Sequence, residues 1–136
     1  MRVAISACLA GQKCRYNGKD KFNKDVMSSF SKDEITLFCP EDAVFGTPRG
    51  PINIIDSKLM QNDKEFTKEI EHEAYKLVDE NPQIVVLKSK SPSCGLNSVK
   101  NYDYNHKLIL ETGIGVFAKV LVDNLIDTKF YEENEL

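Results

Sequence analysis

Four cysteines are the residues of this sequence best suited to carry out chemistry. They are Cys8, Cys14, Cys39 and Cys94, and the last of them lies in the segment SPSCG at residues 91–95. Several thiolates together suit a soft metal centre, either zinc or an iron–sulfur cluster. A single activated thiolate is instead a nucleophile, and a lone cysteine is often no more than a small buried hydrophobic residue. The choice depends on where the fold places the four side chains.

The cellular setting of these thiols follows from the rest of the composition. No apolar stretch approaches the roughly 20 residues of a membrane span, and the first residues do not form a signal peptide. We therefore expect a cytoplasmic protein that makes no membrane contact. Because cytosolic cysteines stay reduced, we expect free thiols rather than disulfides.

The hydrophobic pattern predicts the elements that would position the thiols. Short apolar runs predict four strands, at residues 2–6, 35–39, 84–88 and, as an edge strand, 128–132. Three helices are predicted: one capped by Asn23, one from Asp63 to Asn81, and one capped by Thr112. The proline- and glycine-rich segment 40–55 is expected to be mostly irregular, and a polar loop is expected to contain Tyr102, Asp103, Tyr104 and His106.

This alternation of strands and helices predicts the fold class. A chain of 136 residues has the length of one domain, so we expect a single domain that spans residues 1–136. Strands that are apolar along their whole length are typical of a parallel sheet that helices cover on both faces. We therefore predict an α/β domain with a largely parallel central sheet, in a three-layer, Rossmann-like arrangement.

The cysteines follow the predicted strands. Cys8 lies two residues beyond the first strand, Cys39 ends the second, and Cys94 follows the third by a short loop. Because the carboxyl ends of parallel strands lie at one edge of a sheet, these three thiols should converge on one crevice. The chain has no C-x-x-C pair of the kind that a closed structural zinc site uses. Three ligands and one open position are typical of a centre that performs a reaction, and Cys14 is either a fourth ligand or a bystander.

Four segments of the chain also resemble, in order, the motifs of a known family. They are SACLAGQKCRYNG at 6–18, CPE followed by GTPRGP within 39–51, KSKSPSCG at 88–95 and ETGIGVFAKVL at 111–121. The family is that of the thiouracil desulfidases, and the resemblance extends over essentially the whole chain. It implies a [4Fe–4S] cluster held by three cysteines, whose positions are those of Cys8, Cys39 and Cys94. Family members differ at the position of Cys14, which favours the bystander interpretation.

The resemblance also implies an activity. One iron of the cluster would lack a protein ligand and would accept the sulfur of a thiolated uracil base or nucleotide. Water would replace that sulfur by oxygen, and sulfide would be released without electron transfer. Water attack needs a general base, for which Glu41 is the candidate, and Ser91 is the candidate proton donor or substrate anchor. The alternatives are that Glu41 binds loop amides and that the Ser91 hydroxyl caps a turn.

Charged side chains indicate how a phosphate would be held. Residues 1–24 contain six Lys or Arg and one acidic residue, a local charge of +5, which leaves −8 for the remainder of a chain at −3. Arg15, Arg49 and Lys90 are candidate contacts for a nucleotide phosphate, with Ser93 as a weaker substrate contact. Each cation alone is more often a surface charge. The acidic remainder argues against duplex nucleic acid, and the substrate stays open among free base, nucleoside, monophosphate and RNA.

Two other functions are compatible with the same residues. A persulfide sulfurtransferase would use Cys94 as its nucleophile and would need no other cysteine. A non-catalytic module that binds zinc or an iron–sulfur cluster would hold metal without turnover. Three cysteines at strand ends favour the desulfidase over the sulfurtransferase, and the iron and sulfide content of the purified protein separates these functions.

Overall fold

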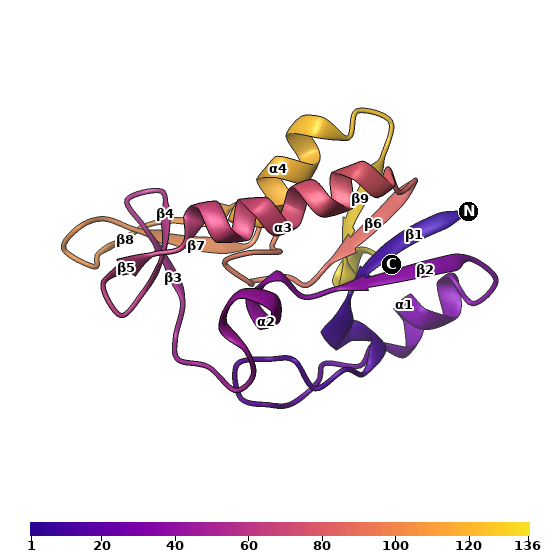
Figure 1. The fold of residues 1–136 in the computed structure, drawn as a ribbon, viewed down its shortest axis with the longest axis horizontal. Coiled ribbons are helices and arrows are strands. Elements are labelled where there is room, and N and C mark those ends of the chain that lie inside the picture. The colour runs from indigo at the N-terminus through magenta and orange to yellow at the C-terminus, as the bar shows by residue number, and fades with distance from the viewer.

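Two β-sheets contain the strands of this protein and lie at opposite ends of the molecule (Figure 1). The computed structural model describes residues 1–136. The helical segments are α1 (Lys24–Ser29), α2 (Pro40–Phe45), α3 (Thr67–Glu80) and α4 (Val116–Asn124), with short 3-10 turns η1 (Ala7–Ala10) and η2 (Glu133–Glu135). None of these helices combines the length and the hydrophobicity needed to cross a membrane.

Sheet A contains the four strands that the apolar runs predict. All neighbouring strands in it are parallel, in the order β2 (Glu34–Phe38), β1 (Arg2–Ser6), β6 (Ile84–Leu87) and β9 (Lys129–Glu132). The inner strands β1 and β6 are mostly buried, as their uninterrupted apolar sequences require. The edge strand β2 is largely exposed. The predicted parallel sheet is therefore confirmed, as is a mixed α/β fold.

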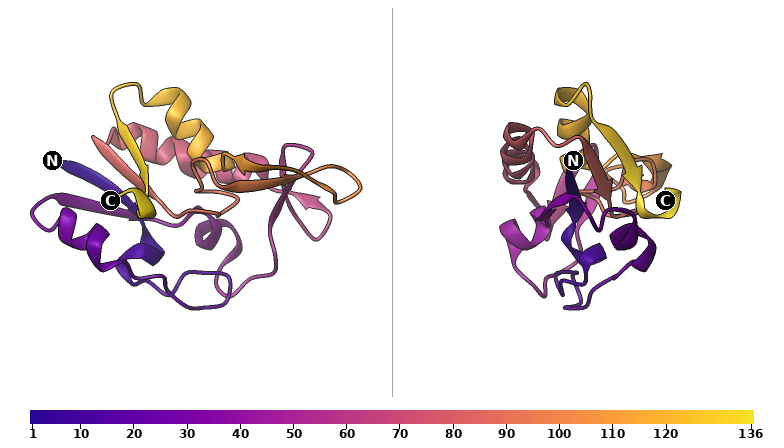
Figure 2. Two further views of the ribbon diagram at one scale, coloured as in Figure 1. Left: turned by 180° about the vertical axis from the view of Figure 1, so that it is seen from behind. Right: turned by 90° about the vertical axis from the view of Figure 1, so that its right-hand side faces the viewer.

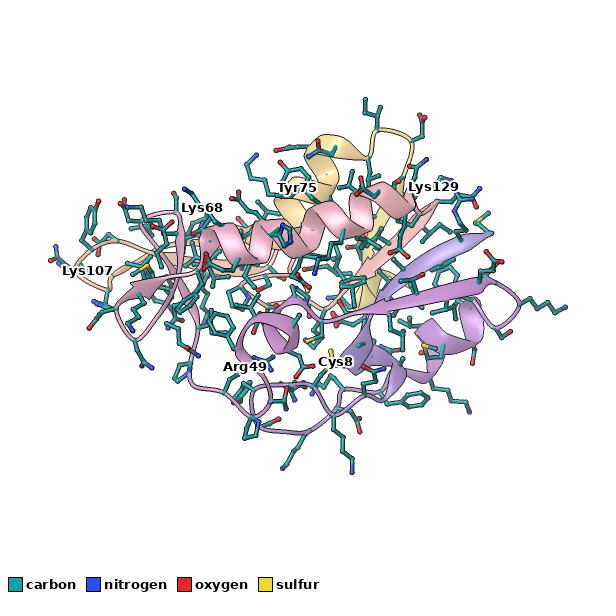
Figure 3. The ribbon with its side chains drawn as sticks, viewed as in Figure 1. Cys8, Arg49, Lys68, Tyr75, Lys107 and Lys129 are labelled. Carbon is teal, nitrogen blue, oxygen red and sulfur yellow. The ribbon has the colours of Figure 1, made fainter.

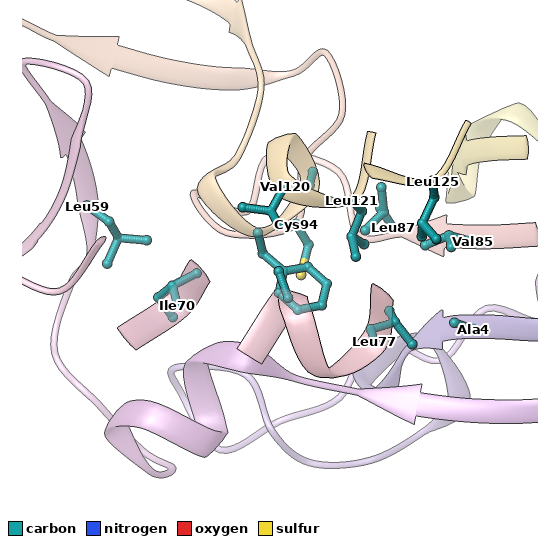
Figure 4. Close-up of a cluster of buried hydrophobic side chains, with 13 residues drawn as sticks. Ala4, Leu59, Ile70, Leu77, Val85, Leu87, Cys94, Val120, Leu121 and Leu125 are labelled. Atoms are coloured by element: carbon teal, nitrogen blue, oxygen red, sulfur yellow. The ribbon is translucent and has the colours of Figure 1, made fainter. Parts of the chain in front are cut away.

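Alternate side chains of the inner strands contribute to two separate parts of the core. On one face, Val3 of β1 packs in a cluster with Val26 of α1. On the other face, Ala4 and Val85 pack in a cluster with α3 and α4, which Figure 4 shows together with Cys94. This alternation is what a pleated strand imposes on successive residues. Helices therefore contact both faces of sheet A.

Sheet B departs from the prediction. Its strands, in spatial order, are β5 (Lys64–Glu65), β4 (Lys58–Gln61), β3 (Asn53–Ile55), β7 (Val99–Tyr102) and β8 (Leu108–Gly113). The prediction that 40–55 is mostly irregular was wrong, because α2 and β3 lie within this segment. The predicted polar loop is present at residues 103–107 and contains His106, but Tyr102 is the last residue of β7. These strands have only two to six residues and lack a regular alternation of apolar and polar side chains, so pattern reading misses them. With this second sheet present, the Rossmann-like, three-layer arrangement stays a prediction.

The β7–β8 hairpin extends sheet B away from sheet A, and both chain termini lie near sheet A (Figure 2). The helix predicted to begin at Asp63 begins at Thr67, because residues 58–65 form an antiparallel pair of strands. The helix predicted to follow Thr112 begins at Val116, since Thr112 lies in β8. The segments predicted to begin these two helices therefore belong to the strands and the turn of sheet B instead.

The two shorter helices begin with recognisable local signals. Asn23 caps α1 as predicted, since its side-chain oxygen accepts a hydrogen bond from the Val26 amide. Helix α2, in a segment predicted to be irregular, begins at Pro40, and Glu41 and Asp42 lie in its first turn. Proline at the first position and acidic residues in the first turn both favour a helix start. These signals explain why the segment after Cys39 is helical despite its prolines.

Candidate functional site

The carboxyl ends of the sheet A strands open onto a cavity of about 1180 Å³. All four cysteines line this cavity, and all four are free thiols. Cys8, Cys14 and Cys94 are buried, and Cys39 is half-buried. The thiols at the ends of β1, β2 and β6 therefore converge on one crevice, and Cys14 lies there with them.

Each cysteine is positioned by a different segment. Cys8 lies in η1, directly after β1, and Cys39 is the capping residue of α2, directly after β2. Cys94 lies in the loop between β6 and β7, and Cys14 lies in the loop between η1 and α1. Figure 3 shows Cys8 and Arg49 between α2 and the N-terminal loop. The site is thus assembled from residues far apart in the sequence.

The loop that carries Cys94 is held first by its own serine. The Ser91 hydroxyl oxygen accepts hydrogen bonds from the amides of Ser93 at 3.2 Å and Cys94 at 3.0 Å. The same hydroxyl donates to the Glu41 carboxylate at 2.9 Å. Ser91 therefore caps the turn before Cys94 and also connects it to α2.

The N-terminus of α4 holds the same loop from a second direction. Three of its amides donate to loop carbonyls: Gly115 to Gly95 at 2.7 Å, Val116 to Pro92 at 3.1 Å, and Ala118 to Ser93 at 3.1 Å. Helices leave their first amides without intrahelical partners, and here those amides bind the cysteine loop. Gly115 permits the approach, because a Cβ atom there would lie 2.3 Å from the Ser93 carbonyl oxygen.

Acidic side chains from the C-terminal segment hold both ends of this loop. Glu132 of β9 is 2% exposed and accepts a hydrogen bond from the Leu96 amide at 2.9 Å. Glu133 accepts one from the Ser89 amide at 2.8 Å. Because buried carboxylates require such donors, these contacts fix where the loop begins and ends. The position of Cys94 is therefore determined by α2, α4 and β9 together.

Glu41 and Arg49 form a buried ion pair at the cavity. An Arg49 nitrogen lies 3.4 Å from a Glu41 carboxylate oxygen, and the Arg49 side chain is only 5% exposed. Arg49 also donates to the Cys14 carbonyl at 2.8 Å and to the Gly46 carbonyl at 3.2 Å, whereas its Nε has no partner. Arg49 thus joins α2 to the loop of Cys14. Of the three nitrogens of the Arg49 guanidinium, only Nε has no hydrogen-bond partner.

The thiols of the site differ in acidity. Burial raises the pKa of Cys8 to about 11, with a further rise from the nearby Cys39. Burial likewise raises the pKa of Cys94 well above its ordinary value, and Cys39 and Glu41 add to the rise. Cys14 and Cys39 share a hydrogen bond, which raises the pKa of Cys39 and lowers that of Cys14. A metal group that binds these sulfurs as thiolates must therefore displace protons from them.

The set of sulfur donors fits a cluster better than a single ion. No three His, Cys, Asp or Glu side chains lie close enough together to hold one metal ion. In an iron–sulfur cluster, by contrast, the thiolates bind different irons, so the ligand sulfurs are spread around the group. Four free thiols, contributed by four different segments, line a cavity of this volume and are compatible with that requirement. The residues present therefore fit a [4Fe–4S] group and do not fit mononuclear zinc.

The other predicted site residues are placed differently. Arg15, Lys90, Ser91, Glu41 and Arg49 line the cavity together with the cysteines. Arg49 is buried and bound by its own chain, so less of it is free for a ligand than the sequence suggests. Ser93 is 0% exposed, does not line the cavity, and its hydroxyl has no partner.

Several charged and aromatic residues of the cavity wall are absent from the predicted set, namely Asp20, Lys21, Lys88, Glu133, Tyr16, Phe22 and Phe38. Lys88 lies 3.6 Å from Glu133 as an ion pair, and both line the cavity. Lys88 could have been identified because it directly follows β6, but nothing in the sequence connects Glu133 with it. Tyr16 and Phe22 also line the cavity. Their position beside the cysteines depends on the conformation of the loop between η1 and α1, which no sequence pattern specifies.

Comparison with known proteins identifies the family. The 2-thiouracil desulfurase family matches residues 3–134. The uncharacterized protein YbbK of Bacillus subtilis (strain 168) is 31% identical over 150 aligned residues, which cover 98% of this chain and 97% of YbbK. The solved structure of the [4Fe–4S]-dependent thiouracil desulfidase TudS is 24% identical to this chain and superposes on it with a TM-score of 0.74. The match covers 99% of this chain and 92% of the TudS chain, so the two proteins share a fold. The resemblance carried by the motifs is confirmed: this chain belongs to the 2-thiouracil desulfurase family.

Proposed function

We propose that this protein is a [4Fe–4S]-dependent desulfidase, which converts the C=S group of a thiolated uracil base or nucleotide to C=O and releases sulfide. The observation that carries the proposal is the convergence of four free cysteines with Glu41 on one cavity. The names of the family and of TudS describe removal of sulfur from thiouracil in related proteins, and the name of TudS adds dependence on a [4Fe–4S] group, which supports the proposal. We further propose a cytoplasmic enzyme in which residues 1–136 form one Rossmann-like domain.

In this proposal Cys8, Cys39 and Cys94 hold the cluster, and Cys14 does not. When bound, the cluster would supply an iron without a protein ligand, a Lewis acid for the sulfur of the thiocarbonyl group. The chain supplies three soft sulfur donors, each at the end of a different strand of sheet A. The reaction consumes one water and yields one hydrogen sulfide, so it requires neither an oxidant nor a reductant.

Glu41 is proposed as the general base that takes a proton from the attacking water. Its carboxylate lines the cavity and is oriented by the Ser91 hydroxyl at 2.9 Å and by Arg49 at 3.4 Å. Both partners are themselves held by backbone hydrogen bonds, Ser91 by two amides and Arg49 by two carbonyls, which suits a group that must meet the water in one geometry. Because the Ser91 hydroxyl donates to Glu41 and accepts two amides, we assign Ser91 to positioning Glu41 and the Cys94 loop.

Replacing Glu41 by glutamine should separate catalysis from cluster binding. Glutamine keeps the size and can accept the Ser91 hydrogen bond, but it cannot take a proton. We expect turnover to fall about 100-fold or more while the iron content per chain stays unchanged. The measurements are the rate of sulfide release and the bound iron.

Asp42→Asn, one residue along the same helix and outside the cavity lining, is the matched control. Wild-type turnover in Glu41→Gln would remove Glu41 from the mechanism.

The charges around the cavity favour a substrate with a phosphate. Five cations line it, namely Arg15, Lys21, Arg49, Lys88 and Lys90, against the three acids Asp20, Glu41 and Glu133. Only two of the six cations of the basic N-terminal segment are among them, so that segment contributes less than its net charge indicates. Of the proposed phosphate contacts, Lys90 is exposed, Arg15 is half-buried, and the Arg49 side chain is only 5% exposed and already bound by its own chain.

Arg15→Ala should therefore lower kcat/KM for a thiouridine monophosphate more than for the free thiouracil base. We expect a loss of about tenfold for the nucleotide and less than twofold for the base, because only the nucleotide carries the phosphate. The preference for the nucleotide should also weaken as salt is added. Lys13→Ala, an exposed cation of the same loop outside the cavity lining, is the control. Equal efficiency for base and nucleotide at low and high salt would contradict phosphate binding.

The environment of Cys94 bears on the sulfurtransferase alternative. A sulfurtransferase needs an accessible thiolate, whereas Cys94 is 5% exposed and burial raises its pKa. The test is anaerobic reconstitution with iron and sulfide, followed by the visible spectrum, the iron content and sulfide release from 2-thiouracil and 4-thiouracil. The desulfidase requires iron and turnover together. Iron without turnover would favour the non-catalytic module, and turnover without iron would favour the sulfurtransferase.

A further inference from the structure

Two large aromatic side chains line the cysteine cavity without being buried. Tyr16 is 55% exposed and Phe22 is 57% exposed. Neither belongs to the two hydrophobic clusters that form the core. Aromatic side chains mostly contribute their large area to a core or to an interface. Their exposure on the wall of a cavity therefore indicates a role in binding rather than in folding.

The backbone around Phe22 is held on both sides. The Lys21 amide donates to the Cys8 carbonyl at 2.9 Å, and the Asn23 amide donates to the Leu9 carbonyl at 2.9 Å. The Phe22 amide itself binds the Asp20 carboxylate at 3.0 Å. Phe22 is thus connected to the same 3-10 turn that carries Cys8. Its ring is exposed although its backbone is fixed, which is how a protein presents a preorganised contact surface.

Tyr16 lies in a closed loop of its own. The Arg15 amide donates to the Lys19 carbonyl at 3.1 Å, and the Gly18 amide donates to the Arg15 carbonyl at 2.8 Å. The Tyr16 carbonyl accepts the Arg49 amide at 3.0 Å, which attaches this loop to the segment after α2. The Arg15 guanidinium carbon lies 5.6 Å from the centre of the Tyr16 ring. Tyr16 is therefore also presented from a fixed backbone.

We propose that Phe22 and Tyr16 stack on the pyrimidine ring of the substrate. A uracil ring has two flat faces, and stacking on aromatic side chains removes them from water whatever the ring substituents are. Most of the other cavity residues discussed above are thiols, charged groups or the Ser91 hydroxyl, which contact the edge of a planar ring better than its faces. These aromatic residues would thus select planar pyrimidines over other thiocarbonyl compounds. This inference rests on the proposed function for the identity of the ring.

The test uses uracil itself, which has the ring but no sulfur to lose. We expect Phe22→Ala to raise the dissociation constant for uracil about fivefold to 150-fold, as measured by calorimetry on the reconstituted protein. Phe22→Tyr, which keeps an aromatic ring, should restore most of the affinity, and Tyr16→Ala should weaken binding in the same way as Phe22→Ala. Because uracil binding needs no turnover, an inactive protein that still shows this pattern would refute the proposed reaction and support the stacking site.

Controls separate stacking from a general loss of structure. Tyr104→Ala removes a tyrosine that is 74% exposed in the turn between β7 and β8, outside the cavity lining, and should leave uracil affinity unchanged. With thiouracil, Phe22→Ala should raise KM more than it lowers kcat, since stacking stabilises ground state and transition state alike. Wild-type affinity of Phe22→Ala for uracil would overturn the proposal, and so would the absence of measurable uracil binding to the wild-type protein.

Discussion

Alanine in place of Cys8, Cys39 or Cys94 is expected to remove bound iron and desulfidase activity together. Each replacement deletes one of three soft ligands from the proposed cluster. Loss of a residue that merely supports a metal ligand typically costs 10- to 100-fold in metal affinity or activity, so loss of a ligand should cost at least about 100-fold. The measurements are iron per chain, absorbance in the visible range and sulfide release, all after anaerobic reconstitution.

Cys14→Ala is the matched control for these variants. Cys14 lines the same cavity, is buried like Cys8 and Cys94, and interacts with Cys39, but it is not a proposed ligand. We expect it to keep its iron and most of its activity. A Cys39→Ala protein with full iron, colour and activity would contradict the three-thiolate site. A requirement for Cys94 alone would instead support the sulfurtransferase.

Gly115→Ala is expected to displace the loop of Cys94 although residue 115 touches no proposed ligand through a side chain. The new Cβ atom would lie 2.3 Å from the Ser93 carbonyl oxygen and 2.9 Å from the Cys94 amide nitrogen. Both are backbone atoms, so the loop and the start of α4 must separate. Overpacking of this kind costs about 1–3 kcal/mol of the free energy of unfolding. Urea denaturation of the iron-free protein measures that cost, and iron content after reconstitution measures the displacement.

Gly50→Ala provides the comparison for this substitution. A Cβ atom at Gly50 meets only the end of the Gln61 side chain, at 3.7 Å, so the change should alter the free energy of unfolding by less than about 0.5 kcal/mol. If Gly115→Ala were as stable as the wild type and bound as much iron, the contact between α4 and the cysteine loop would not determine the site.

The sequence was sufficient to predict the parts of the site that depend on strand ends. β1, β2 and β6 are apolar runs followed within a few residues by cysteine, and parallel pairing then brings Cys8, Cys39 and Cys94 to one edge. Glu41 could be identified because it lies two residues beyond Cys39. These inferences need only the period of a strand and the direction of a parallel sheet.

The rest of the site depends on contacts between segments that local patterns do not connect. Glu133 binds the Ser89 amide 44 residues away, and α4 binds the Cys94 loop through backbone amides that any sequence possesses. Sheet B was missed for a related reason, because short strands with exposed side chains have no hydrophobic period. Such features are determined by tertiary packing, which residue types and spacing do not specify.

The strand order of sheet A also has a consequence for the speed of folding. β1 lies between β2 and β6, and the Lys88 amide binds the Ser6 hydroxyl across 82 residues of chain. Pairing over such a distance closes a long loop, and proteins that depend on non-local contacts fold in milliseconds to seconds rather than microseconds. During that interval Cys94 is separated from Cys8, and the thiols are open to solvent with their ordinary reactivity. The nascent chain should therefore be most vulnerable to oxidants before β6 docks beside β1, a period that ends when the cavity closes around its cysteines.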